Sequence, residues 1–508
     1  MDKFKEECGV FGIWNHTEAS NMTYLGLYAL QHRGQEGCGI VSLHNNELVL
    51  KKGKGLVADN FDEESLRKLK GLASIGHVRY STTQAHDVAD VQPLMASFQG
   101  SFLALAHNGN LTNAKKLRDE LESDGAIFQS HSDTEIFLHL IAKSKKINFK
   151  EKVIEALQKV EGAFSLIILT KHGLLVARDS YGFRPLVLGR LPNVIPARSA
   201  KRNSGDLKNE VTYSYVIASE TCAFDLIGAE SIREIEKGEL LDIRDDGLHS
   251  IQAITETPQK SCIFEYVYFA RPDSEVYGQN VYEIRRNMGQ RLARERPVEA
   301  DMVIPVPDSG VPAAIGYAQT SGIPYDMGII RNHYVGRTFI EPQQSIRHFG
   351  VKVKLNAVRK VIEGKRLIVI DDSLVRGTTS RKIIKMLRDN GAKEVHMRIS
   401  SPPTTHSCFY GIDTPTREEL IASSQSIEEI RKYISADSLA YLSKEGMIEA
   451  ASQKTYLVGE GAPPCHSREG GNPEILDPVS RFTRTGLGIF NLTLSKIPST
   501  GLASFYLS

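Results

Sequence analysis

The chain has 508 residues, of which 41% are hydrophobic and 24% are charged, as in ordinary globular proteins. This length predicts about three domains. The formal net charge of +1 gives no reason to expect binding to nucleic acid or to an anionic membrane. Anionic substrates would therefore have to be held by local Arg, Lys, amide and metal groups.

Cysteine usage and the N-terminus indicate the compartment. The six cysteines are scattered and form no C-x-x-C pair; they are Cys8, Cys38, Cys222, Cys262, Cys408 and Cys465. This spacing favours a reducing compartment over a secreted disulfide fold. The stretch Met1–Glu7 is too polar for a signal peptide, and no apolar run is long enough to span a membrane. We expect a cytoplasmic protein with no membrane or nucleic-acid partner.

Cys8 begins the first predicted strand, the apolar stretch 8–14. A cysteine in this position is usually a small core residue. However, Cys8-Gly-Val-Phe-Gly resembles the start of class II (N-terminal nucleophile, Ntn) glutamine amidotransferases. In that family the cysteine becomes the first residue once a leader, here residues 1–7, is removed. The freed α-amine has a pKa near ~8 and can then accept the thiol proton.

Further motifs follow in the order found in that family. A helix predicted over Glu18–Leu30 leads into Gln31-His-Arg-Gly34, where a residue without a Cβ can turn its N–H toward an oxyanion. The guanidinium of Arg79 suits a bidentate grip on a carboxylate. The resemblance implies that Cys8 is the nucleophile and that Gly34 and Asn108 bind the oxyanion. It also implies a set of glutamine-binding residues: Arg79, Asn108, Gly109 and Asp133.

Each of these residues also has a structural interpretation. Arg79 would suit a surface salt bridge, Asn108-Gly109 a hairpin turn and Asp133 a helix N-cap, and His32 and His107 would suit the core. Taken together and in this order, they favour a glutaminase. Strands are predicted over residues 162–169, 174–178 and 215–219. The resemblance implies that they belong to a four-layer αββα sandwich.

Two irregular stretches interrupt the middle of the chain. Residues 191–209 are basic, lack periodicity and are longer than most connections, so we interpret them as a mobile surface loop. The alternative is a phosphate-binding role for Arg198, Lys201 and Arg202. Residues 251–260 are the expected join, which predicts one domain over 8–250 and another over 261–455.

A parallel sheet is predicted in the second domain. Residues 301–310 form a strand and a polar turn before a helix at 311–320, and Leu367–Ile370 is an unbroken apolar strand. Asp371 and Asp372 follow at its carboxyl end, where open α/β sheets bind ligands. The turn 376–380, before a helix expected over 381–390, offers amides and hydroxyls to a phosphate. The alternative is that the acidic pair only caps a helix.

Residues 367–380 resemble the fingerprint of type I phosphoribosyltransferases, which bind 5-phosphoribosyl-1-pyrophosphate (PRPP). With its neighbours, the chain resembles the amidophosphoribosyltransferase family. The stretch 334–347 resembles the loop that closes over PRPP in that family. The resemblance implies a PRPP site formed by Arg337, Asp371, Asp372, Arg376, Gly377, Thr378, Thr379 and Ser380. It implies Mg²⁺ bound by Ser309, Asp371 and Asp372.

This resemblance implies a two-site enzyme. Glutamine, water and PRPP would give glutamate, pyrophosphate and 5-phosphoribosylamine, with ammonia passed internally, as the first step of de novo purine synthesis. We expect a homotetramer inhibited by purine nucleotides, with Tyr80 relaying PRPP binding to the glutaminase. Two rivals remain. One is another class II amidotransferase, such as one that makes an amino sugar, and the other is a non-catalytic nucleotide-sensing regulator.

The end of the chain departs from the family. Some members hold a [4Fe–4S] cluster with four cysteines, and Cys262 and Cys408 match the first two. The C-terminal C-x-x-C is absent, so Cys465 is at most a third ligand, which argues against a complete cluster. Within the atypical tail, residues 456–508, the stretch 465–508 resembles a translated bacterial repeat element or an altered reading frame. We predict a disordered tail, with a partner-binding segment as the alternative.

Overall fold

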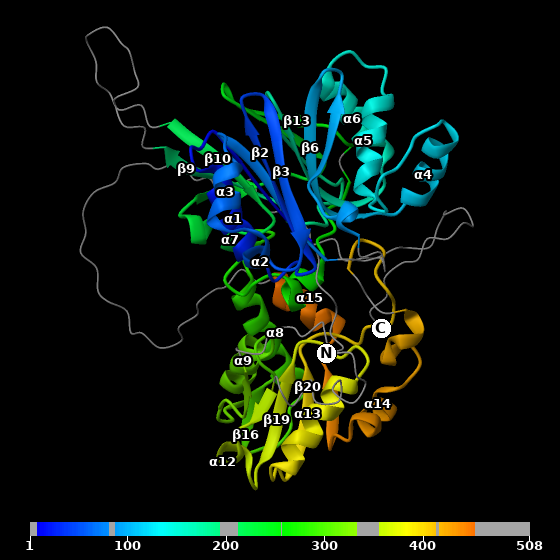
Figure 1. Ribbon diagram of the computed structural model, residues 1–508. Helices are drawn as coiled ribbons and strands as arrows, with labels where there is room; N and C mark the ends of the chain where they lie inside the picture. The colour runs from blue at the N-terminus through cyan, green and yellow to red at the C-terminus, as the bar shows by residue number, and fades with distance from the viewer. Residues whose placement is uncertain are drawn as a thin grey trace, which may run out of the picture.

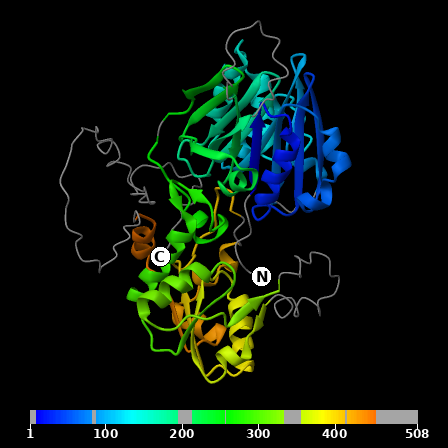
Figure 2. The same ribbon diagram turned by 90° about the vertical axis from the view of Figure 1, so that its left-hand side faces the viewer.

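The computed structural model describes residues 8–80, 87–193, 212–255, 257–332, 355–412 and 416–452. Figures 1 and 2 show two parts, one built on large antiparallel sheets and the other on a smaller parallel sheet. No helix within these ranges has both the length and the apolar character needed to cross a membrane.

The first sheet has seven strands in the order β11-β9-β10-β1-β4-β2-β3. β1 lies inside this sheet, antiparallel to both β10 and β4. At its start β1 lies beside β4, where Gly9 pairs with Val78, whereas its pairing with β10 begins at Phe11. The strands are β1 (Gly9–Trp14), β2 (Gly37–His44), β3 (Glu47–Lys54), β4 (Ala73–Arg79), β9 (Val187–Asn193), β10 (Thr212–Ala218) and β11 (Glu230–Glu234).

The second sheet has six strands in the order β13-β12-β8-β7-β6-β5. It packs face to face on the first sheet, with Val10 and Ile75 of the first meeting Ala106 and Ile167 of the second in one buried cluster. The strands are β5 (Leu94–Phe98), β6 (Ser101–Leu111), β7 (Gly162–Thr170), β8 (Gly173–Arg178), β12 (Glu239–Arg244) and β13 (Gly247–Gln252).

Helices cover the outer face of each sheet. α1 and α7 pack against Phe11 on the outside of the first sheet, and α5 and α6 pack against Leu105 on the outside of the second. The order of layers is therefore αββα, as predicted. The helices of this part are α1 (Ala19–Ala29), α2 (Val57–Asn60), α3 (Glu63–Lys68), α4 (Ala114–Ser123), α5 (Thr134–Lys143), α6 (Phe149–Lys159) and α7 (Cys222–Ile227).

The second part contains a parallel sheet in the order β16-β19-β20-β21. Ile368 and Ile370 of β19 face α8 and α9, whereas Leu367 and Val369 face α13. Because β19 is buried on both faces, its sequence is an unbroken run of apolar residues. The strands are β16 (Met302–Pro305), β19 (Arg366–Asp371), β20 (Glu394–Ile399) and β21 (Ser438–Tyr441).

The remaining elements surround this sheet. The helices are α8 (Val281–Glu295), α9 (Val311–Ser321), α12 (Arg359–Ile362), α13 (Thr378–Asp389), α14 (Ile427–Ile434) and α15 (Lys444–Ser452). Two short pairs of strands are β14 (Glu275–Val276) with β15 (Gln279–Asn280), and β17 (Ile329–Arg331) with β18 (Leu355–Ala357). One turn of π-helix, Glu265–Phe269, lies where the two parts of the chain meet.

Three expected boundaries differ from the structure. α13 begins at Thr378 rather than at 381, because Gly377 (φ +74°) makes the turn and the hydroxyl residues form the first helical turn. β9 extends through residues 191–193 because they pair with β10, so the irregular stretch starts later than expected. β13 includes residues 251 and 252 of the expected join.

Several predictions fall on residues outside the described ranges. They concern the leader 1–7, the rest of the insertion, the loop 334–347 and the tail 456–508. The individual residues concerned are Arg198, Lys201, Arg202, Arg337 and Cys465.

Candidate functional site

Cys8 directly precedes β1, beside the end of β4. Its Sγ donates to the backbone carbonyl of Tyr80 at 3.5 Å. Burial raises the pKa of this thiol to about 11, although a backbone hydrogen bond of Tyr80 and the positive charge of Arg79 act in the opposite direction. The thiol is therefore protonated at neutral pH and needs a base before it can act as a nucleophile.

Arg79 ends β4 and has a buried acidic neighbour. A terminal nitrogen of its guanidinium lies 3.6 Å from Oδ2 of Asp90, and its side chain is only 11% exposed. Asp90 is itself fixed, because its Oδ1 accepts a hydrogen bond from the backbone N–H of His131 at 2.7 Å. Arg79 is thus held inside the site rather than in a surface salt bridge. No sequence motif indicates this role for Asp90.

Asn108 and Gly109 lie in the middle of a strand pair. They face Ser165 and Phe164 of β7 in register, so they do not form a hairpin turn. A Cβ on Gly109 would lie 1.9 Å from the carbonyl oxygen of Ala163. Asn108 is 1% exposed, and its Nδ2 has no hydrogen-bond partner among the described residues. A buried, unpaired donor costs about 1–3 kcal/mol and marks a place for a ligand acceptor.

Asp133 precedes α5, but its side chain does not cap that helix. Instead, Oδ2 accepts from the backbone N–H of Leu111 at 2.9 Å, and Oδ1 lies 3.6 Å from Nδ1 of His107. Burial alone would raise the pKa of this carboxyl, but the neighbouring His107 and the Leu111 N–H bring it below its usual value. Asp133 therefore presents a carboxylate. His107 is buried as the structural interpretation expected, and it also supports the site.

Gly34 packs directly on β4. A Cβ there would lie 2.7 Å from the backbone of Val78 and Arg79, so this close approach requires a glycine. Gln31 holds the turn, because its Nε2 donates to the Gly34 carbonyl at 2.5 Å and its Oε1 accepts from the N–H of Val57 at 2.7 Å. Close packing on β4 therefore requires glycine at position 34, in addition to any contact of its N–H with an oxyanion.

The acidic pair of the second part lies at the carboxyl end of β19, as predicted. Asp371 and Asp372 are each 1% exposed. The N–H of Asp372 donates to Oδ1 of Asp371 at 3.0 Å, and Ser373 Oγ donates to Oδ1 of Asp372 at 2.5 Å. Both carboxylates are thus held in place by local hydrogen bonds.

The turn after β16 lies against the same strand end. A Cβ on Gly310 would lie 2.5 Å from the carbonyl oxygen of Ile370, and that oxygen also accepts from the N–H of Val306 at 2.8 Å. The turn that contains Ser309 and Gly310 therefore lies close to the end of β19.

α9 and α13 both begin without a side-chain cap, so their first amides can receive a phosphate. At the start of α13, Thr379 and Ser380 are buried and Thr378 is partly exposed. Arg376, by contrast, pairs with Glu419 at 2.8 Å.

The iron–sulfur hypothesis concerns Cys262 and Cys408 in the described part of the chain and Cys465 outside it. Cys262 and Cys408 border the same buried cluster, and Cys408 Sγ accepts from the N–H of Tyr410 at 3.3 Å. Within the described part of the chain, no group of three or more His, Cys, Asp and Glu side chains could hold a metal ion. Two of the four thiolates that such a cluster uses are thus present in that part.

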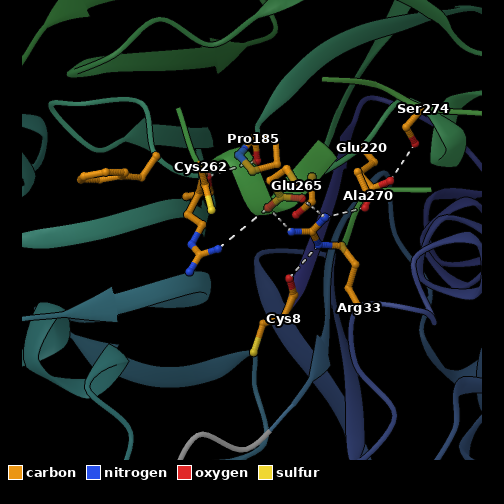
Figure 3. Close-up of polar contacts among 12 residues, drawn as sticks. Cys8, Arg33, Pro185, Glu220, Cys262, Glu265, Ala270 and Ser274 are labelled. Carbon is orange, nitrogen blue, oxygen red and sulfur yellow. Dashed lines mark hydrogen bonds and ion pairs between the residues drawn. The ribbon is translucent and has the colours of Figure 1, made fainter. Parts of the chain in front are cut away.

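A buried ionic group joins the two parts beside Cys8, and sequence reasoning assigned it no role. Arg33 donates to the carbonyl of Cys8 and to the carboxylates of Glu220 and Glu265, and all three charged side chains are fully buried (Figure 3). Arg33 belongs to the recognised 31–34 motif. Its partner in the second part, Glu265, is brought next to it only by folding.

Comparison with known proteins assigns both halves. A profile described as a glutamine amidotransferase domain matches residues 77–201, and one described as a phosphoribosyl transferase domain matches residues 277–400. These matches agree with the two sites described above.

Curated relatives and solved structures cover nearly the whole chain. The amidophosphoribosyltransferase of Bacillus subtilis is 51% identical over 450 residues, which are 88% of this chain and 90% of that protein. The chloroplastic amidophosphoribosyltransferase of Vigna aconitifolia is 48% identical over 489 residues, 96% of each chain.

A solved structure described as the allosteric regulatory enzyme of purine biosynthesis has a TM-score of 0.81 at 50% identity, and covers 88% of this chain and 92% of that one. The B. subtilis glutamine PRPP amidotransferase complexed with ADP and GMP has a TM-score of 0.79 at 50% identity, with 88% and 93% covered. The predicted fold, activity and family are confirmed. The chain belongs to the amidophosphoribosyltransferases, pentosyltransferases with a glutamine amidotransferase domain that carry out the first step of purine biosynthesis.

Proposed function

We propose that this chain carries out its family's reaction at two sites, with Cys8 as the nucleophile of the first and with Asp371 and Asp372 central to the second. The observation that carries the proposal is the buried Nδ2 of Asn108, which has no partner among the described residues. A substrate oxyanion would satisfy it.

In the first half-reaction, the Cys8 sulfur attacks the side-chain amide carbon of glutamine. Because the pKa of the thiol is raised to about 11, its proton must go to a nearby base. The α-amine of Cys8 can serve once residues 1–7 have been removed, whereas the peptide nitrogen of the uncleaved chain cannot. The oxyanion then accepts from the N–H of Gly34 and from Nδ2 of Asn108. Ammonia leaves, and water hydrolyses the thioester to glutamate.

Two opposite charges would orient glutamine. Arg79 binds the α-carboxylate and Asp133 binds the α-ammonium, while the backbone of Gly109 lies beside them. This assignment is supported by electrostatics, since the charges of Arg79 and Asp133 both act on the pKa of the Cys8 thiol. Cys8, Arg79 and Asp133 therefore share one electrostatic environment.

In the second half-reaction, ammonia displaces pyrophosphate from C1 of PRPP. The 5-phosphate would occupy the start of α13, with its uncapped amides and the hydroxyls of residues 378–380. Asp371 and Asp372 would accept hydrogen bonds from the ribose hydroxyls. Arg376 would have to exchange its pair with Glu419 for the phosphate.

The residues that would hold Mg²⁺ are Ser309, Asp371 and Asp372. Their oxygen atoms are the ligand type that magnesium prefers, and the substrate's pyrophosphate would supply further oxygens. When bound, the ion would neutralise negative charge on the departing pyrophosphate. A contribution of Arg337 to this site remains a prediction.

Glutamine-dependent release of pyrophosphate from PRPP tests the proposal. The wild type should use glutamine or ammonia, whereas Cys8→Ala should use ammonia alone. A wild type that is inactive with both nitrogen sources would favour the regulatory alternative. A Cys8→Ala variant that still uses glutamine would exclude the assigned nucleophile.

Several wider assignments also remain proposals. Cys8, Cys38 and Cys222 are free thiols, which supports a reducing compartment such as the cytoplasm. The nucleotide complex of the B. subtilis relative supports inhibition by purine nucleotides here. A homotetramer and the boundaries 1–7, 8–250, 261–455 and 456–508 stay predictions. We assign no step to an iron–sulfur cluster, because the described cysteines do not complete its ligand set.

A further inference from the structure

The π-helix Glu265–Phe269 lies between the two candidate sites. Four of its five residues are buried: Glu265, Tyr266, Val267 and Phe269. π-Helical turns are rare and occur frequently at functional sites. Both ends of this turn are held by buried arginines, one from each part of the chain.

Arg33 of the first part holds one end. Two of its guanidinium nitrogens donate to the two carboxylate oxygens of Glu265, at 3.0 and 2.8 Å. Its Nε donates to the carbonyl of Cys8 at 3.1 Å, and it also binds Glu220 at 2.5 Å (Figure 3). One rigid, planar group therefore connects the backbone of the nucleophile to a carboxylate of the second part.

Arg285 of α8 holds the other end. Its Nε donates to the carbonyl of Tyr266 at 2.6 Å, and its Nη2 donates to the carbonyl of Ala270 at 2.8 Å. Burial lowers the pKa of Arg285 to about 10, while the negative charges of Asp372 and Glu220 favour its cationic form. Arg285 therefore holds the backbone of the π-helix, and its neighbour Ile284 packs in the same buried cluster as Ile370, which directly precedes the acids of the PRPP site.

We propose that Glu265 is a positioning residue of the glutaminase site, and that the buried chain Arg285–π-helix–Glu265–Arg33 transmits occupancy of the PRPP site to Cys8. This inference rests on the proposed function. A phosphorylated ligand beside Asp372 changes the charge that Arg285 faces. Any shift of Arg285 displaces the two carbonyls it holds, and Glu265 passes the shift to Arg33 and to the carbonyl of Cys8.

The simpler alternative is that these charges only fasten the two parts together. Removing one partner of a buried ion pair destabilises a protein in any case. A claim of coupling therefore needs a readout that fastening alone would not change. That readout is the ratio of glutaminase turnover with PRPP to turnover without it.

Glu265→Gln keeps the shape of the side chain and removes its charge. We expect glutamine-dependent kcat/KM to fall by about tenfold or more and the PRPP stimulation ratio to approach one, as for the loss of a typical allosteric coupling. Ammonia-dependent synthesis bypasses the first site and should stay within about twofold of wild type. Glu265→Asp should restore part of the stimulation. Arg285→Lys cannot span both carbonyls, so it should reproduce the loss.

Tyr277→Phe is the matched control. The Tyr277 hydroxyl donates to the carbonyl of Phe183 at 2.6 Å and accepts from the N–H of Cys262 at 3.3 Å, so its loss loosens the same joint without touching Arg33 or Cys8. PRPP stimulation should survive in this variant. A second readout is the rate at which a glutamine-like diazoketone alkylates Cys8, which PRPP should raise in the wild type and in Tyr277→Phe but not in Glu265→Gln.

Three results would overturn the inference. They are unchanged stimulation in Glu265→Gln, an equal loss of its ammonia-dependent activity, and the same loss of stimulation in Tyr277→Phe. A wild type that makes no phosphoribosylamine from either nitrogen source would instead refute the proposed function, so the two failures can be told apart.

Discussion

Replacing Asn108 by Leu should separate catalysis from stability. The two side chains are similar in size, and Asn108 is buried with an Nδ2 that no described group satisfies. A buried donor without a partner costs about 1–3 kcal/mol. Removal of the Asn108 amide should therefore leave the free energy of unfolding unchanged or raise it by about 1 kcal/mol. Loss of one oxyanion donor should lower glutaminase kcat by about 10²–10³-fold, or about 2.7–4 kcal/mol in activation free energy.

Asn113→Leu is the control of the same chemical type. The Asn113 side chain donates to the carbonyl of Lys159 and accepts from the N–H of Glu161, both at 3.0 Å. Its replacement should lower the free energy of unfolding by about 0.5–1.5 kcal/mol, because both hydrogen bonds are exposed to solvent, and leave glutaminase turnover unchanged. Thermal unfolding midpoints and glutamate release measure the two effects. The oxyanion assignment fails if Asn108→Leu keeps wild-type turnover, or if it loses stability without losing turnover.

Three further predictions concern the surroundings of Cys8. In chains that retain residues 1–7, iodoacetamide labelling of Cys8 should rise about tenfold per pH unit from pH 7 to pH 9, because burial raises the thiol pKa to about 11; a plateau in this range would contradict that pKa. Gly34→Ala should destabilise the chain by about 1–3 kcal/mol and reduce glutaminase activity, because its Cβ would collide with the backbone of β4; an unchanged unfolding midpoint would contradict this. Tyr80→Phe should reduce PRPP stimulation of glutaminase turnover, and unchanged stimulation would exclude Tyr80 as the relay.

Local sequence patterns predict secondary structure well where a single physical cause, such as burial of a strand, determines it. The apolar run before Asp371 indicated a strand buried on both faces, and the structure places it between α8 and α9 on one face and α13 on the other. α13 starts three residues before the helix expected at 381, because Thr and Ser, which also suit turns, form its first turn after the left-handed Gly377.

Only those residues of the candidate site that belong to family motifs could be predicted from the sequence. Arg79 and Asp133 were found from motifs, but their supports were not, because the pairing of Arg79 with Asp90 depends on the folded path of an unrelated segment. The same holds for Glu265 and Arg285. A buried glutamate or arginine is indistinguishable from a solvated one in sequence, and its burial depends on partners far along the chain.

The central claim is that nitrogen freed at Cys8 reaches PRPP without entering the solvent. It can be tested by supplying glutamine labelled with ¹⁵N in the amide together with excess unlabelled ammonium, and by measuring the isotope in trapped phosphoribosylamine by mass spectrometry. If ammonia passes internally, the phosphoribosylamine keeps the ¹⁵N enrichment of the glutamine amide. Dilution to the isotopic ratio of the bulk ammonium would contradict it.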